Sequence, residues 1–250
     1  REERRRLVAG LQQLGAVFRV QGSLQEAEKS FSQARTIALE YEAAEPGNIY
    51  WRRAASAATQ GYAQTLAERG DDAAAIPILK SDMDAMRAVL ATNPNSAKLL
   101  DDTISTASWL LQSYEQTHDK EGVQAMRKEL LALADRLEKL DGRSVYPSIT
   151  RSVVLTGESR EMEAEGKMDE ARERMRGLIA SLEEHLPTLD SDIESTRGLS
   201  VAYYRYGNML YRNQDFGAAE AAALRGVELQ RGLLAQQPGD LAVMHDVAVF

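Results

Sequence analysis

The sequence predicts an all-α fold, an α-solenoid built from stacked antiparallel helix pairs. Three observations lead to this prediction. A turn signal recurs every 48 residues, apolar residues between the turns follow helical spacings of three and four, and strand signals are absent. We therefore expect five full helix pairs followed by a partial sixth.

The turn signal begins with Gly22, Gly70 and Gly166, which are 48 and 96 residues apart, and His118 and Gln214 complete the series. Four residues before each turn the chain carries an apolar residue: Phe18, Leu66, Tyr114, Met162 and Leu210. Five residues after each turn it carries a small or β-branched residue: Ala27, Ala75, Val123, Ala171 and Ala219. Breaks follow 24 residues after the turns, at Pro46, Pro94, Gly142, Asp190 and Pro238. Chance does not keep these positions aligned over five units.

These positions divide residues 1–250 into one array of repeat units. The units span about 1–47, 48–95, 96–143, 144–191, 192–239 and a partial 240–250. In the first unit "LVAGLQQLGAVF" forms one apolar helical face, and Ser23 with Glu26 has the spacing of a capping box at the start of the second helix. Asp71 or Asp72 is the expected N-cap in the second unit. The third unit is the most degenerate, with the turn "THDKEG".

Both ends of the chain interrupt a pattern. It begins in the charged stretch "REERRR" and stops inside the apolar stretch "DLAVMHDVAVF". We therefore expect a segment excised from a larger protein. The half unit at 240–250 has no second helix to cover it, which leaves open self-association through this C-terminal half repeat.

Two units carry a family signature. Leu14-Gly15-x-x-Phe18 followed by Ala27-x-x-x-Phe31 resembles the tetratricopeptide repeat, as does "YGNML" at 206–210. This resemblance implies a right-handed superhelix, although the 48-residue unit is longer than the usual 34 and is similar to long-unit bacterial arrays. It also implies a concave groove that is lined by the first helix of each pair and binds a partner peptide.

The composition of the chain argues against several classes of function. The net charge is −8 and the pI is about 5.1, which argues against nucleic acid as the main partner. There is no cysteine, no apolar run long enough to cross a bilayer, and no phosphate loop or metal-binding histidine pattern. Trp51 and Trp109 are expected to pack between helices. We expect no catalysis, no cofactor and no membrane insertion by this segment.

The groove positions of the resembling family can be placed in this chain from the packing-glycine position. They are mostly amides, hydroxyls and arginines, which can hydrogen-bond a peptide backbone and pair with carboxylates. The predicted partner-binding residues are Gln12, Arg19, Gln60, Gln64, Gln112, Arg160, Tyr204, Asn208, Tyr211 and Arg212.

Two functions remain open. The first is a non-catalytic scaffold that binds a partner peptide or protein segment in the groove. The alternative is a sensory domain of a multidomain bacterial signalling protein, such as a receptor serine/threonine kinase, that recognises a ligand or an envelope component. The cellular compartment also remains open: it is cytoplasmic, or periplasmic if the chain is the sensor part of a receptor kinase.

Overall fold

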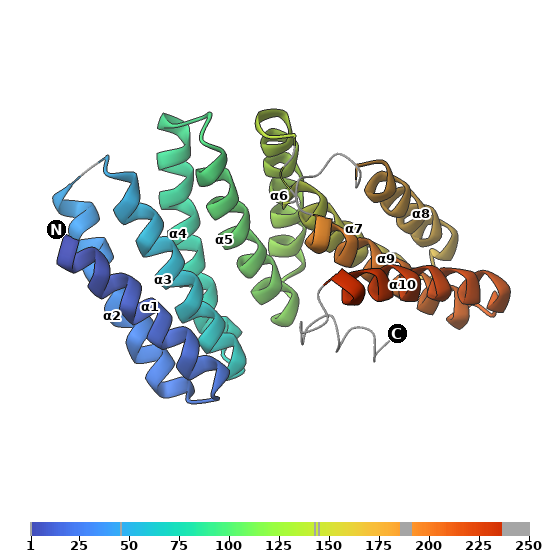
Figure 1. Ribbon diagram of the computed structural model, residues 1–250, viewed down its shortest axis with the longest axis horizontal. Helices are drawn as coiled ribbons and strands as arrows, with labels where there is room; N and C mark the ends of the chain where they lie inside the picture. Colours follow the sequence, from blue (N-terminus) through green and yellow to red (C-terminus); the bar gives the residue numbers. More distant parts are fainter. Residues whose placement is uncertain (1, 46, 143, 145, 186–191, 237–250) are drawn as a thin grey trace. The chain divides into compact units, whose positions relative to one another are not determined.

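The computed structural model of the chain describes residues 2–45, 47–142, 144, 146–185 and 192–236, and these form helices and short connections without a strand. The helices are α1 (Glu2–Val20), α2 (Leu24–Ala44), α3 (Ile49–Glu68), α4 (Asp72–Thr92), α5 (Ala97–Gln116), α6 (Lys120–Leu140), α7 (Tyr146–Ala164), α8 (Met168–His185), α9 (Asp192–Arg212) and α10 (Phe216–Gln236). They follow one another as helix–turn–helix pairs (Figure 1). The predicted partial sixth unit at 240–250 lies outside the described residues.

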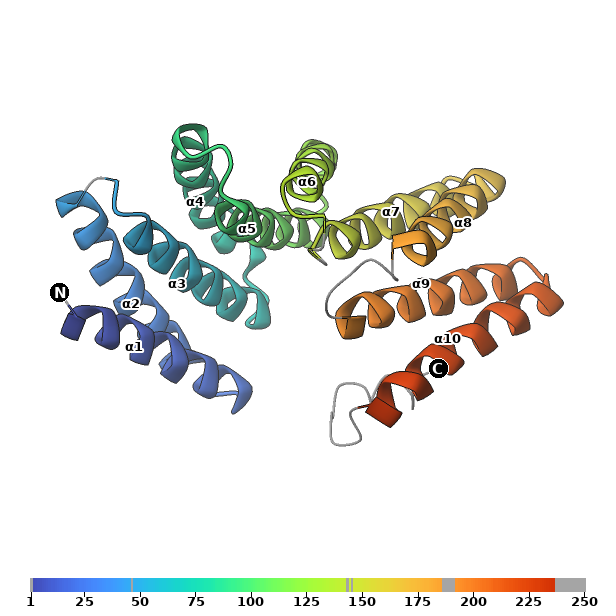
Figure 2. The ribbon, with the colours of Figure 1, turned by 45° about the horizontal axis from the view of Figure 1, so that its top comes forward.

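The chain forms two compact bodies, Arg1–Leu133 and Ala134–Phe250, and the division falls within α6. In the first body α3 contacts α1, α2, α4 and α5, and in the second body α9 contacts α7, α8 and α10. Figure 2 shows α9 and α10 running side by side in the second body. The predicted division of residues 1–250 into repeat units stays a prediction.

The same turn closes all five helix pairs. The backbone φ is positive at Gly22, Gly70, His118, Gly166 and Gln214, the five positions where the sequence predicts turns. At each one the next residue donates its N–H to the carbonyl five residues earlier, at distances of 2.8–3.0 Å. This is the Schellman motif, which satisfies the last carbonyls of the first helix. His118 and Gln214 adopt it although a side chain makes a left-handed φ costly.

The start of each second helix depends on which side chain follows the turn. Asp71 is the N-cap of α4, and its carboxylate accepts a hydrogen bond from the Ala74 amide at 3.2 Å. Ser23 occupies the N-cap of α2, but its side chain makes no capping hydrogen bond, so the predicted capping box with Glu26 is wrong. Both residues lie outside the extended region that a serine cap prefers, and the longer aspartate side chain can still reach the amide.

Glycines allow the helices of a pair to approach closely. A Cβ on Gly15 of α1 would lie 2.9 Å from the Phe31 ring, and a Cβ on Gly61 of α3 would lie closer still to the same ring. Phe31 of α2 therefore packs between two glycines. Gly207 of α9 has the same role, because a Cβ there would lie 3.3 Å from the Ala219 carbonyl oxygen of α10.

The tryptophans differ in burial. Trp51 is fully buried in a core with Val8, Ala34 and Ala55, which confirms the expected packing role. Trp109 on α5 is only half-buried. In the second body the core joins α8 and α9 through a separate set of apolar residues: Ala171, Met175, Leu178, Ile179, Leu182, Leu199, Ala202 and Met209.

Candidate functional site

Two predicted groove residues on α1 form hydrogen bonds with α3, the first helix of the following pair. Gln12 donates its Nε2 to the Ala54 carbonyl on α3 at 2.8 Å, and Arg19 Nη1 pairs with Glu68 Oε1 on α3 at 2.9 Å. Both side chains are half-buried. These contacts hold α1 against α3, so each side chain already has a structural role.

Gln60 on α3 likewise forms hydrogen bonds with the first helix of the following pair, α5. Its Nε2 donates to Thr106 Oγ1 at 2.9 Å, and its Oε1 accepts from Ser105 Oγ at 2.8 Å, both on α5. Gln64 is half-buried on α3 and Gln112 is exposed on α5. The structure therefore does not bring the five predicted residues of the first body together into one pocket.

The second body is different, because three predicted residues line one pocket between α7 and α9. Arg160, Asn208 and Arg212 meet around a cavity of about 130 Å³. The full lining is Thr156, Ser159, Arg160 and Glu163 from α7, Met175 from α8, and Arg205, Asn208, Met209 and Arg212 from α9. We call it the α7/α9 pocket.

One ion pair crosses the α7/α9 pocket. Arg212 Nη2 donates to Glu163 Oε1 at 2.9 Å and to Oε2 at 2.8 Å. The Glu163 side chain is only 14% exposed, whereas that of Arg212 is 61% exposed. The glutamate thus anchors the arginine at the edge of the cavity.

Beside this pair the pocket contains polar groups that face no protein partner. Thr156 is 2% exposed, and its Oγ1 has no hydrogen-bond partner among the described residues. Arg160 is exposed and forms no ion pair within the described part of the chain. Ser159, in contrast, donates its hydroxyl to the Leu155 carbonyl at 2.9 Å. A buried hydroxyl without a partner carries a free-energy cost that a bound polar group would remove.

The charge of the lining is positive. The pocket contains three arginines and one glutamate, although the whole chain carries a net charge of −8. Arginine offers five N–H donors in a planar group, and it binds carboxylates with two parallel hydrogen bonds. The α7/α9 pocket can therefore hold one negatively charged group.

The two predicted tyrosines lie outside this lining. Tyr211 is 64% exposed, and its ring packs edge-on against Phe216 with centroids 5.4 Å apart. Tyr204 is half-buried on the same helix.

The predicted set does not contain the other six lining residues of the pocket, among them Arg205 and Met175. Arg205 lies three residues before Asn208 on α9, a spacing that places both on one helix face. Met175 comes from α8, a second helix, and periodicity places it in the core. The helical spacing could have identified Arg205, whereas nothing in the pattern distinguishes Met175 from other core methionines.

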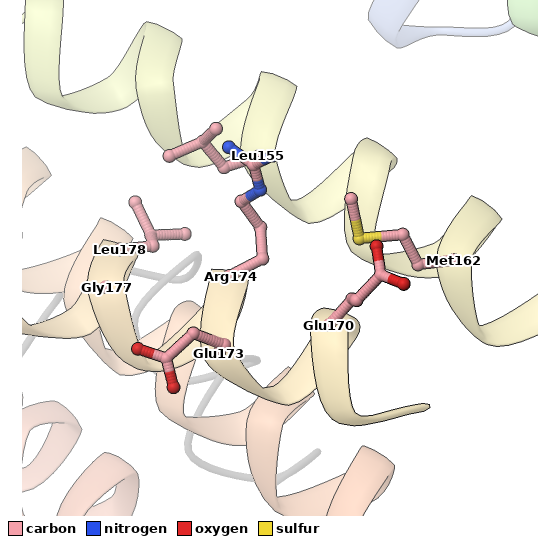
Figure 3. Close-up of a pocket in the computed structure, with 7 residues that line it drawn as sticks. All are labelled: Leu155, Met162, Glu170, Glu173, Arg174, Gly177 and Leu178. Atoms are coloured by element: carbon pink, nitrogen blue, oxygen red, sulfur yellow. The ribbon is translucent and has the colours of Figure 1, made fainter. Parts of the chain in front are cut away.

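A second pocket of about 510 Å³ lies between α7 and α8 (Figure 3). Leu155 and Met162 project into it from α7, and Leu178 projects from α8. Two of its three charged lining residues form ion pairs, since Arg174 Nε lies 3.5 Å from Glu158 and Glu173 pairs with Arg176, and Glu170 is the third. None of the predicted partner-binding residues lines this second pocket, so we place the candidate site in the α7/α9 pocket.

Within the described residues no group of three or more acidic or histidine side chains could hold a metal ion. Among the same residues, no helix is both long and apolar enough to cross a membrane.

Neither a protein-family model nor a curated protein sequence matches the chain. Solved structures do. The crystal structure of BtubC (BKLC) from P. vanneervenii is 16% identical, with a TM-score of 0.66 over 92% of this chain and 82% of that one. A putative kinesin light chain with nearly identical TPR-like repeats from Podosopora anserina is 16% identical, with a TM-score of 0.57 over 95% and 99%. A single-residue variant of that kinesin light chain is 17% identical, with a TM-score of 0.59 over 92% and 99%.

These likenesses extend over nearly the whole chain and agree with the helix pairs described above. They confirm the predicted fold class. The chain has the tetratricopeptide-repeat fold, an all-α solenoid of antiparallel helix pairs.

Proposed function

We propose that the chain is a protein-interaction scaffold that binds a partner segment through the α7/α9 pocket and anchors it by one acidic side chain. Tetratricopeptide-type solenoids are generally scaffolds for protein–protein interaction, which favours binding over catalysis. The observation that carries the proposal is the meeting of Arg160, Asn208 and Arg212 around one cavity.

The size of the pocket favours a side chain over a cofactor. Sites for drug-sized molecules occupy roughly 300–1,000 Å³, whereas this cavity is about 130 Å³. A carboxylate of aspartate or glutamate fits that volume. The rest of the partner segment would lie along the exposed surface of α9, where Tyr211 offers an aromatic contact.

Each polar group has a distinct role in this proposal. Arg160 pairs with the carboxylate, and Thr156 donates its unpartnered hydroxyl to it. Asn208 offers both an amide donor and an acceptor, so it can bond the partner's backbone. Arg212 is held in place by Glu163, and only its Nη2 is engaged in that pair. Its remaining N–H groups can donate to the partner.

Selection of a random peptide library against the full-length chain tests the proposal. We expect the selected peptides to share an aspartate or glutamate at one position, and to lose binding to the Arg160→Ala/Asn208→Ala variant. Arg231→Ala is the matched control, because Arg231 is an exposed arginine on α10 outside the pocket. Selected peptides that bind the double variant as well as the wild type would exclude the α7/α9 pocket.

A further inference from the structure

The first body contains a buried ionic network that joins four helices. Arg52 on α3 pairs with Asp82 on α4, and their side chains are 5% and 2% exposed. Arg52 Nη1 also donates to Glu42 on α2, at 3.1 and 3.4 Å to its two oxygens. The second oxygen of Asp82 accepts hydrogen bonds from Ser56 at 2.6 Å and from Thr106 of α5 at 3.2 Å.

Comparable positions later in the chain carry no such network. Forty-eight residues later along the chain, the positions of Arg52, Ser56 and Asp82 are occupied by three apolar residues. These are Leu100, Ile104 and Leu130, with exposures of 0%, 3% and 0%. Apolar residues of similar volume often stabilise a protein as well as a buried ion pair does, because the pair must first be removed from water. The charged network therefore points to a role other than packing.

A groove of about 350 Å³ adjoins the network between α2, α3 and α4. We call it the α2/α4 groove. Its lining is Arg35, Leu39, Glu42 and Ala43 from α2, Arg52 and Thr59 from α3, and Ser81, Asp82 and Ala85 from α4. This groove lies in the first body and shares no residue with the α7/α9 pocket.

Two arginines in this groove retain hydrogen-bonding capacity. The Arg52 Nε is buried and has no acceptor among the described residues, although both of its Nη atoms are engaged. Arg35 donates its Nε to Thr59 Oγ1 at 3.1 Å, and within the described residues it forms no ion pair. One buried donor and one arginine without an ion pair among the described residues thus line the same cavity, whose two arginines balance the charges of Glu42 and Asp82.

We propose that the α2/α4 groove is a second binding site and that its ligand carries a carboxylate. The carboxylate accepts a hydrogen bond from Arg52 Nε and pairs with the terminal nitrogens of Arg35, while Ser81 supplies a hydroxyl and Leu39 contacts the apolar part. Asp82 pairs with Arg52 and accepts hydrogen bonds from two hydroxyls, so its carboxylate is already satisfied within the network. Glu42, which is 25% exposed, is the intramolecular carboxylate that competes for Arg52.

The nitrogen-15 NMR signals of the Arg35 and Arg52 Nε–H groups in the full chain test this proposal directly. The probes are succinate and an acetylated alanine–glutamate–alanine amide, with the glutamine version of that peptide as the control. We expect both Nε–H signals to shift saturably with a carboxylate probe and to stay in place with the glutamine peptide. A response to succinate alone identifies a small acid as the ligand, and a response to the peptide alone identifies an acidic side chain of a partner.

Variants separate binding from stability. Arg35→Ala should weaken binding of the carboxylate probe by about tenfold or more, which is the loss of affinity expected when one charge-assisted hydrogen bond is removed. Glu42→Gln should tighten binding of the probe, because the carboxylate that competes for Arg52 is gone. The control Arg231→Ala should leave the affinity for the probe unchanged. The triple variant Arg52→Leu/Ser56→Ile/Asp82→Leu copies the chain's own apolar positions, so it should fold and lose the site.

The proposal is overturned if neither carboxylate probe shifts the two Nε–H signals at millimolar concentration. It is also overturned if the glutamine peptide shifts them equally, or if Arg35→Ala binds as tightly as the wild type. Circular dichroism reports whether the triple variant has folded. If that variant is unfolded, the Arg35→Ala and Glu42→Gln results decide the question without it.

Discussion

Arg212 on α9 and Glu163 on α7 form the same inter-helix ion pair as Glu68 on α3 and Arg19 on α1, with the charges exchanged. The arginine–glutamate distances are 2.8 and 2.9 Å. Arg19 and Glu163 each lie three residues before the positive-φ residue of their turn, and Glu68 and Arg212 lie two residues before theirs. Opposite charges thus occupy these two positions, in either order, at two contacts between successive first helices, whereas the α3–α5 contact has Ala67 and Gln116 there.

A double-mutant cycle with Arg212→Ala and Glu163→Ala should give a coupling free energy of about 0.5 kcal/mol, the magnitude typical of partly exposed ion pairs. Urea unfolding of the four proteins measures it. Added salt should reduce the coupling, because Arg212 is exposed to solvent. Additive effects at low salt would show that the pair contributes nothing to stability.

Gly15→Ala should destabilise the first body by about 1–3 kcal/mol, because the added methyl group overpacks against Phe31. Gly10→Ala on the same helix is the matched control. No atom lies within 4 Å of a Cβ at that position, so alanine should stabilise the helix by about 0.5–1 kcal/mol. Thermal unfolding monitored by circular dichroism measures both changes. Equal effects of the two substitutions would contradict the packing between Gly15 and Phe31.

Asp82→Ala alone should cost about 3–5 kcal/mol, because it leaves the buried Arg52 without its main counter-ion. The combined Arg52→Leu/Asp82→Leu variant should lose much less, since Leu100 and Leu130 fill the corresponding positions 48 residues later. Chemical unfolding of both variants provides the comparison. A combined variant that is less stable than Asp82→Ala would show that the network is needed for the fold.

Tyr203 should make stability depend on alkaline pH. Burial, and then its hydrogen bond to Glu183 at 2.8 Å, raise the pKa of this phenol above its ordinary value of 10.0. The folded state therefore holds the phenolic proton more tightly than the unfolded state. The resulting stability is present below pH 10 and is lost as the pH rises through the folded-state pKa. Unfolding free energies measured across that range should fall less steeply for Tyr203→Phe, and an unchanged slope would contradict this role.

The recurring turn signal in the sequence made much of the fold predictable. The turn positions could be found because a left-handed residue must recur at each helix end, and glycine marks three of the five. Gly15 and Gly207 could be assigned to helix packing because they keep the family spacing, and both lie against their partner helix. The turn residue and the packing glycine both serve contacts within one helix pair. Their positions can therefore be found from the periodicity of the sequence alone.

The interactions between helix pairs were less accessible to sequence reasoning. The pattern does not show that α5 supplies Ser105 and Thr106 to satisfy the side-chain amide of Gln60. The residues 48 positions after Arg52 and Asp82 are apolar, so nothing periodic pairs the two charges. Such contacts depend on three-dimensional proximity between residues about 30 or 45 positions apart.

The most direct test of the central claim is the dissociation constant of one selected acidic peptide, measured by isothermal titration calorimetry. The peptide and its version with the acid replaced by glutamine are titrated into the wild type and into Arg160→Ala. If the α7/α9 pocket holds the carboxylate, glutamine should weaken binding to the wild type by about tenfold or more, and should have little effect on binding to Arg160→Ala. The same loss in both proteins would show that the carboxylate is recognised elsewhere and would contradict the account.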